Sequence, residues 1–159
     1  MRARGKDDES FVPRGQRELM PNPESARKGA GSSESRDPLL RMTAYRLGCE
    51  LVHEAWQDAE QLRHHPTTKD VSGQLYSAVA SIAANLAEGY SHSSGRDRAR
   101  LFEYALGSTR EAQVWFRTAQ PVLGHDVVNE RVSKLEQIRR LLLATIPRER
   151  GRLIRPTRQ

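Results

Sequence analysis

The sequence predicts an all-α fold, an antiparallel up-down four-helix bundle over residues 39–146. Four segments in this range repeat apolar residues at steps of three and four, which is the spacing of one helix face. Only a few residues separate one segment from the next, so consecutive helices are expected to pack as antiparallel neighbours. No two-residue apolar alternation typical of a β-strand occurs between these residues.

The first segment ends before Pro66, because the residue that precedes a proline is displaced from the helical region. Its predicted core face is Leu40, Ala44, Leu47, Leu51, Ala55, Ala59 and Leu62. A second apolar stripe of Tyr45, Val52 and Trp56 lies beside this face. A bundle core needs about three positions in seven, so we interpret the additional stripe as a contact surface for another subunit or another protein.

The second segment is expected to begin near Thr67 or Thr68 as a cap and to end with Gly89 as the C′ residue. Its predicted core residues are Val71, Leu75, Ala78, Val79, Ile82 and Leu86. The opposite face is mostly small, which would allow another backbone to come close; it consists of Ser77, Ser81, Ala84 and Glu88.

The third segment opens with Ser94, followed three residues later by Asp97, which approximates a capping box. It is expected to stop near Pro121, with a core face of Leu101, Phe102, Ala105, Ser108, Thr109, Ala112, Phe116 and Ala119. Gly107 lies opposite this face, one heptad before Val114, although an internal glycine costs about 1 kcal/mol relative to alanine. It is either a tolerated surface glycine or a close contact with a neighbouring helix, within the bundle or in another subunit.

The fourth segment is expected to begin at an Asp126 cap and to be ended by Pro147. Its predicted core face is Val128, Val132, Leu135, Ile138, Leu142 and Ile146.

Both ends of the chain differ from the bundle in composition. Residues 1–38 contain hardly any adjacent apolar residues and are expected to form a disordered tail. The formal charge of +6 is concentrated in a short basic tail, residues 147–159, which holds five arginines and one acid. Arginine suits phosphate pairing, although a short basic end can equally be a solvated, solubilising segment.

The single cysteine, Cys49, excludes a disulfide within the chain and favours a reducing compartment. The N-terminus has no apolar segment resembling a signal peptide, and the longest apolar run is far too short to span a bilayer. The sequence therefore predicts a cytoplasmic protein without a membrane partner.

No catalytic, cofactor or metal constellation is found. Cys49 and His53 lie four residues apart on one helix face, but no third ligand is near them in the sequence. Ser108 has no histidine at a spacing that suggests a base, and its hydroxyl is expected to bond the carbonyl four residues back. A polar group on the flanks of the second and third segments would fix their register or, alternatively, contact a ligand; its members are Asn85, Glu88, Ser108 and Glu111.

Two sequence elements resemble a known family. The string Ser-Ile-x-x-Asn-Leu-Ala-Glu-Gly at residues 81–89 resembles the four-helix-bundle proteins named for reading frames in intervening sequences of 23S ribosomal RNA genes. The string Ala-x-Gly-Ser-x-x-Glu at residues 105–111 resembles the next element of the same family. The residues that carry the two elements are Ser81, Asn85, Glu88, Gly89, Gly107, Ser108 and Glu111.

The resemblance implies a left-handed up-down bundle that assembles into a ring-shaped homo-oligomer, a pentamer. It also implies kinship with the accessory variability protein of diversity-generating retroelements, which is similar in architecture, binds nucleic acid and partners a reverse transcriptase. The family has no established enzymatic activity. This chain departs from it at Tyr76 and Ser77, where the family usually has arginines, and at Ala112, where it usually has leucine.

The leading functional hypothesis is a non-catalytic homo-oligomer that binds RNA or DNA through basic residues. The candidate contacts are Arg96, Arg98, Arg100, Arg110, Arg117, Arg139, Arg140, Arg148, Arg150, Arg152, Arg155 and Arg158. The alternative is a protein-interaction scaffold or accessory subunit, for example for a reverse transcriptase. The candidate subunit contacts are Tyr45, Val52, Trp56, Gly107 and Val114. An enzyme such as a nuclease is supported only by scattered acids.

Overall fold

The computed structural model describes residues 37–151, and in this range the chain is entirely helical, without a β-strand. A short 3-10 helix precedes four α-helices: η2 (Pro38–Arg41), α1 (Thr43–Arg63), α2 (Lys69–Ser91), α3 (Gly95–Leu123) and α4 (His125–Arg150). The predicted N-terminal tail, except for its last two residues, and the end of the predicted basic tail lie outside the described residues.

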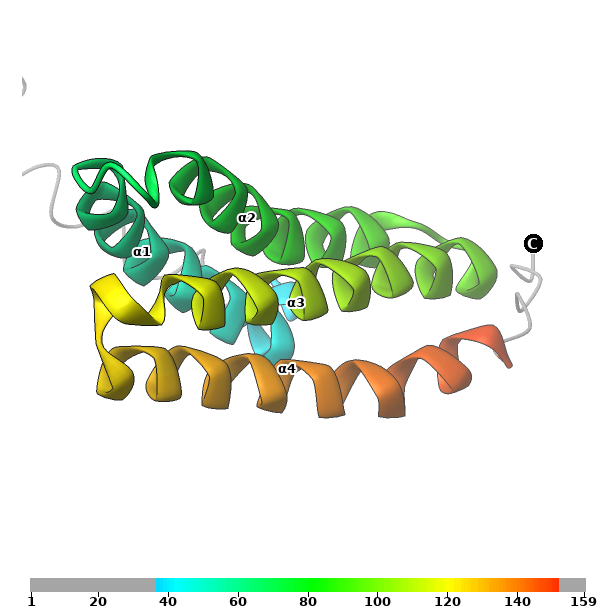
Figure 1. The fold of residues 1–159 in the computed structure, drawn as a ribbon. Helices are drawn as coiled ribbons and strands as arrows, with labels where there is room; N and C mark the ends of the chain where they lie inside the picture. The colour runs from blue at the N-terminus through cyan, green and yellow to red at the C-terminus, as the bar shows by residue number, and fades with distance from the viewer. Residues whose placement is uncertain (1–36, 152–159) are drawn as a thin grey trace, which may run out of the picture. The chain divides into compact units, whose positions relative to one another are not determined.

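The helices lie side by side and are joined by short loops (Figure 1). Each helix packs mainly on its neighbours in the sequence, α1 on α2, α2 on α3 and α3 on α4, whereas α1 and α4 meet more sparsely. A single apolar core runs between them, and its largest fully buried side chains are Phe102, Phe116, Leu51, Leu62, Leu75, Ile82, Leu86, Leu135, Ile138 and Leu142. The predicted all-α fold with four helices is therefore confirmed.

The predicted core faces of α2, α3 and α4 are buried except for Val71, Ser108 and Val132, which are half-buried. The first predicted segment departs further from its predicted core face. Leu40 is exposed because Asp37 caps η2, with its Oδ1 accepting a hydrogen bond from the Leu39 amide at 2.9 Å, and the chain bends before α1. Farther along α1, Gly48 and Asp58 are buried, while the predicted core residues Leu47 and Ala59 are only half-buried.

Gly89 does not end α2, so this prediction is wrong. The helix continues to Ser91, and Gly89 is buried inside it against α3. A Cβ at this position would lie 2.8 Å from Phe102 Cε1 and 3.0 Å from Leu101 Cβ. The residue is a glycine because the two helices approach closely here, and a left-handed backbone plays no part.

Pro147 does not end its helix, so this prediction is wrong, whereas α3 ends two residues after Pro121, near the predicted position. Pro121 lies inside α3, which continues to Leu123 and ends at Gly124, whose φ of 85° turns the chain directly into α4. Gly124 therefore takes the N-cap position predicted for Asp126. Pro147 lies inside α4, which runs to Arg150.

The last turn of α4 is held by side chains from α3. Arg98 pairs with Glu149 at 3.2 Å, and Arg150 pairs with Glu103. A proline inside a helix removes one backbone hydrogen bond, and these ion pairs offset that loss. The bundle consequently includes the first four residues of the predicted basic tail, 147–150.

The other two predicted N-terminal caps, those of α2 and α3, behave differently. Ser94 caps α3, and its Oγ accepts a hydrogen bond from the Asp97 amide at 3.4 Å. Thr68 stands at the N-cap of α2 without capping it; its hydroxyl instead donates to the Leu62 carbonyl at 3.0 Å and ties α2 to the end of α1. Within residues 37–151 no helix combines the length and apolar character needed to cross a membrane.

Candidate nucleic-acid interface

Four of the candidate arginines lie on the outer side of α3. A helix advances about 100° per residue, which places Arg96, Arg100, Arg110 and Arg117 within one arc that faces away from the core. All four are exposed, and none of them makes an ion pair with another described residue. These side chains are therefore available to an external anion.

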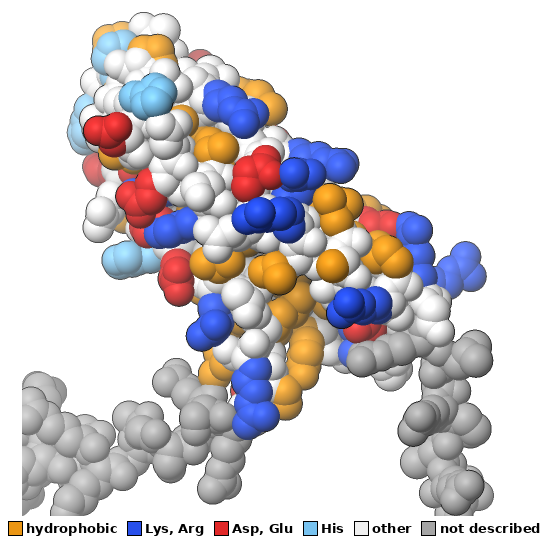
Figure 2. Space-filling model, turned by 90° about the horizontal axis from the view of Figure 1, so that it is seen from below, with side chains coloured by type: hydrophobic (Ala, Val, Ile, Leu, Met, Phe, Trp, Pro, Cys, Tyr) orange, Lys and Arg blue, Asp and Glu red, His pale blue; other side chains and the backbone are white. Residues whose placement is uncertain are grey.

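Helix α4 adds arginines along its edge beside α3. This edge is located by the Gln113 to Glu136 hydrogen bond at 2.7 Å and by the ion pair between Arg150 and Glu103. Together the two helices form what we call the basic α3–α4 face, which consists of Arg96, Arg100, Arg110, Arg117, Arg139, Arg140 and Arg150. In Figure 2, which views the molecule from below the orientation of Figure 1, basic side chains and apolar side chains alternate over much of the surface.

Four acids lie on or beside the basic α3–α4 face: Asp97, Glu103, Glu111 and Glu136. Three of them are engaged by neighbouring donors. Glu103 pairs with Arg150, Glu136 pairs with Arg139 at 2.7 Å, and Glu111 accepts a hydrogen bond from the Trp115 indole at 3.2 Å. The hydrogen bond from Arg139 is the main reason why the pKa of Glu136 is lowered. The seven arginines thus outweigh the four acids. Five of the arginines make no ion pair with another described residue, although the charge of Arg117 also lowers the pKa of Glu136.

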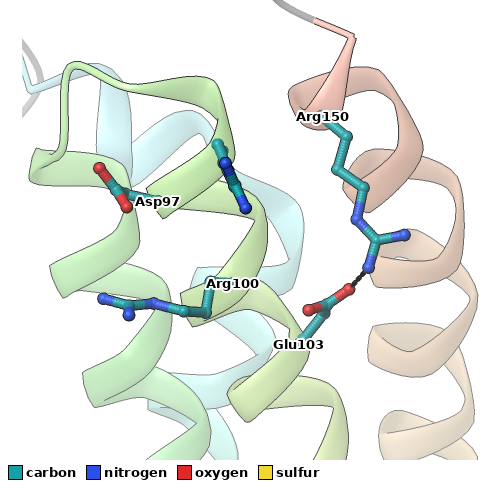
Figure 3. A pocket seen from close by; sticks show the side chains of 5 residues that line it. Asp97, Arg100, Glu103 and Arg150 are labelled. Carbon is teal, nitrogen blue, oxygen red and sulfur yellow. Dashed lines mark hydrogen bonds and ion pairs between the residues drawn. The ribbon is translucent and has the colours of Figure 1, made fainter.

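A hollow of about 770 Å³ lies at the end of the bundle where α3 begins and α4 ends. Its lining residues are Arg96, Asp97, Arg100, Glu103 and Arg150. Figure 3 shows the Glu103 carboxylate directed toward Arg150, while the Arg100 side chain extends away from this pair. The hollow therefore presents the Arg96 and Arg100 guanidiniums, with its Glu103 carboxylate already neutralised.

Other candidate arginines are placed elsewhere. The Arg98 side chain is only 18% exposed, because it turns inward to Glu149 beside a smaller hollow of about 310 Å³. Arg148 is exposed, but it projects from α4 about 120° away from Glu136 around the helix axis. Arg152, Arg155 and Arg158 lie outside the described residues.

The polar motif residues make one hydrogen bond between helices. Ser108 on α3 donates to Ser81 Oγ on α2 at 3.1 Å, in place of the expected bond to its own helix. Asn85 donates to the Ser81 carbonyl at 2.8 Å, within α2. The two acids of the group, Glu88 and Glu111, are exposed, so the link between α2 and α3 runs through serine hydroxyls.

The candidate subunit contacts differ in exposure. Trp56 and Val114 are 60% and 57% exposed, whereas Tyr45 and Val52 pack partly against the core. Nothing lies within 4 Å of a Cβ built at Gly107. The interpretation of Gly107 as a close contact within the bundle is therefore wrong, while its interpretation as a contact with another subunit stays a prediction.

Sequence reasoning missed a charged cluster between α1 and α4. Arg131 pairs with Asp58 at 2.9 Å and with Glu54 at 3.3 Å, and Lys134 also pairs with Glu54. Burial raises the pKa of Asp58 despite the opposing hydrogen bond from Arg131. The sequence spacing could have indicated this cluster. Glu54 and Asp58 are four residues apart and Arg131 and Lys134 are three apart, so each pair lies on one helix face.

This cluster joins acids to bases, so it stabilises an interface and does not resemble a metal site. Among residues 37–151 no three His, Cys, Asp or Glu side chains are grouped so that they could hold a metal ion. That holds for Cys49 and His53 as well, which are both exposed on α1.

Comparison with known families gives one result. The family model described as 23S rRNA-intervening sequence protein matches residues 41–144. The match covers α1, α2 and α3 completely and most of α4. The chain therefore belongs to this family. No curated protein matches the chain.

Proposed function

We propose that this member of the 23S rRNA-intervening sequence protein family binds RNA or DNA, without catalysing a reaction, through phosphate contacts from the basic α3–α4 face. One observation carries the proposal: two packed helices carry seven arginines on one side, and five of these arginines are exposed and make no ion pair with another described residue. A guanidinium has the planar donor geometry that suits a phosphate group.

The length of the face suits a chain of phosphates better than a single small anion. Arg96 and Arg117 are separated by 21 residues on one helix, which corresponds to about 31 Å at 1.5 Å per residue. Each phosphate neutralised by an arginine releases condensed counterions, so the affinity should fall steeply as salt is raised.

A salt titration with matched variants tests the proposal. The triple variant Arg96→Gln, Arg110→Gln and Arg117→Gln removes three charges from the face, and Arg41→Gln, Arg46→Gln and Arg63→Gln removes three from η2 and α1. Fluorescence anisotropy with a labelled RNA should give the first variant a weaker affinity and a salt slope that is smaller by about 2 for a single strand, with the second near wild type. Wild-type affinity no better than that of a neutral control protein at low salt would overturn the proposal.

We also propose that the bundle is left-handed and up-down, and that it assembles into a ring-shaped homo-oligomer, a pentamer, in the cytoplasm. The exposed Trp56 and Val114 and the open surface at Gly107 support self-association, because each leaves room or apolar surface for another subunit. Light scattering should give a mass of several subunits, and Gly107→Leu should reduce that mass while the helix content is retained. A monomer at tens of micromolar would contradict the assembly.

A second candidate function is a protein-interaction scaffold, such as an accessory subunit of a reverse transcriptase. It is favoured by Trp56, which stands exposed on α1 with its ring 5.6 Å from that of Tyr76 on α2. Large exposed aromatics are common anchors of protein interfaces. If a reverse transcriptase is encoded next to this chain, Trp56→Ala should abolish its capture, while the Arg96, Arg110 and Arg117 variant should still capture it.

A further inference from the structure

Tyr104 is an exposed aromatic side chain on α3, at the border of the basic α3–α4 face. The sequence has four tyrosines, and three of them, Tyr45, Tyr76 and Tyr90, are half-buried. Tyr104 is 55% exposed. It follows Arg100 by one helical turn and lies about 40° from it around the axis of α3, on the side toward Ser108 and α2. This position has no role in the core of the bundle.

The surface next to Tyr104 is open. Gly107 follows Tyr104 by one turn, and a Cβ built there would meet nothing within 4 Å. Arg110 follows one further turn along the helix and is exposed. Tyr104 therefore has an exposed arginine, Arg100, one turn before it and an open surface after it, whereas Arg110 lies about 120° from Tyr104 around the helix axis.

This arrangement favours a single strand over a duplex. Proteins that bind single strands combine cations for the phosphates with aromatic rings on which unpaired bases stack. In a duplex the base faces are covered by stacking, and a helix reads the base edges only by entering the major groove, which is about 12 Å wide. Helix α3 packs against both α2 and α4, so it cannot enter such a groove alone.

We propose that Tyr104 stacks on a base of single-stranded RNA or DNA whose neighbouring phosphate is bound by Arg100. This inference rests on the proposed function, and it assigns the class of nucleic acid and a stacking residue that the charges alone do not supply.

The test compares Tyr104→Leu, which removes the ring but keeps an apolar side chain, with Tyr104→Phe, which keeps the ring. Leu143→Ala, at an exposed apolar position on α4, is the matched control. Affinities are measured at one salt concentration for a single-stranded oligonucleotide of about 12 nucleotides and for a duplex of the same sequence. Light scattering of each variant verifies that its assembly is unchanged.

Tyr104→Leu should weaken single-strand binding about tenfold, without changing its salt slope, and should leave duplex binding unaltered. Tyr104→Phe and Leu143→Ala should both stay near wild type. Equal single-strand affinity for Tyr104→Leu and wild type, or an equal loss on single strand and duplex, would overturn the inference. A wild-type protein that binds neither oligonucleotide would instead contradict the proposed function.

Discussion

Helix α4 carries basic residues on two sides that differ in their surroundings. Toward α1, Arg131 is 11% exposed and is surrounded by Asp58, Glu54 and Glu130. On the edge beside α3, Arg140 is exposed and has no ion-pair partner among the described residues. The same residue type therefore serves internal packing at one position and is available to a ligand at the other, and the neighbouring helix decides which.

The two sides also hold their helices differently. The contact between α1 and α4 is the sparser one and relies on buried charges, whereas α3 and α4 are joined by an extended apolar seam. Removing a charge from the contact between α1 and α4 should lower the free energy of unfolding. Removing charges from the basic α3–α4 face should lower only the affinity for nucleic acid. The following predictions test that difference, beginning with the largest effect.

Asp58→Ala should lower the free energy of unfolding by about 2 kcal/mol, because the half-buried Arg131 loses its nearest acidic partner and keeps only Glu54 and Glu130. Urea denaturation measures the loss, and Glu50→Ala, at an exposed position on the same helix, is the control with the same loss of charge. Nucleic-acid affinity should stay at the wild-type level.

A double variant separates the cost of an unpaired charge from a loss of packing. Asp58→Leu with Arg131→Met removes both charges and should recover most of the stability, since a buried ion pair is often no better than an apolar pair of similar volume. If the double variant is no more stable than Asp58→Ala, the role assigned to the charged cluster is wrong.

Two glycines provide a matched pair inside helices. Gly89→Ala should destabilise the protein by about 1 kcal/mol, because the new methyl group would press on the buried Phe102. Gly107→Ala should stabilise it by about 1 kcal/mol, because alanine is the better helix former and the position is open. Thermal unfolding followed by circular dichroism measures both. If both variants shift the melting temperature in the same direction, either Gly89 is not enclosed or Gly107 is not open.

The smallest effect concerns the exposed pair of Glu136 and Arg139. The hydrogen bond from Arg139 lowers the pKa of Glu136 in the folded protein, so its contribution is present above the unfolded pKa of about 4.3 and is lost as the pH falls through the folded pKa. Wild type should therefore lose slightly more stability than Glu136→Gln between about pH 6 and pH 3. Identical pH profiles would show that the pair contributes nothing.

Sequence reasoning predicted the helices well and their ends poorly. The apolar periodicity located the core of α2, α3 and α4 because a repeat of three and four residues follows directly from helix geometry. Pro147 was misleading, because whether a helix continues past a proline depends on contacts beyond it. At Pro147 those contacts are Arg98 with Glu149 and Arg150 with Glu103, which join residues far apart in the chain.

For the candidate site, the sequence predicted the residue type, arginine, but not which arginines share one face. Regional charge counting assigned most of the positive charge to the C-terminal tail, and yet the bundle itself assembles a basic face. Counting charges along the chain could not separate Arg131, which is half-buried and ion-paired, from Arg110, which is exposed. Likewise, Tyr104 looked no different in sequence from the half-buried tyrosines.

The sequence by itself determined the helical class, the number of helices and the family, because helix periodicity and the two motif strings are properties of consecutive residues. Only the tertiary structure decided which charges are cancelled, which glycines meet a neighbour and where the arginines gather. These properties depend on residues that are distant in the chain, such as Asp58 and Arg131, and a charge becomes buried or available only when another helix packs beside it.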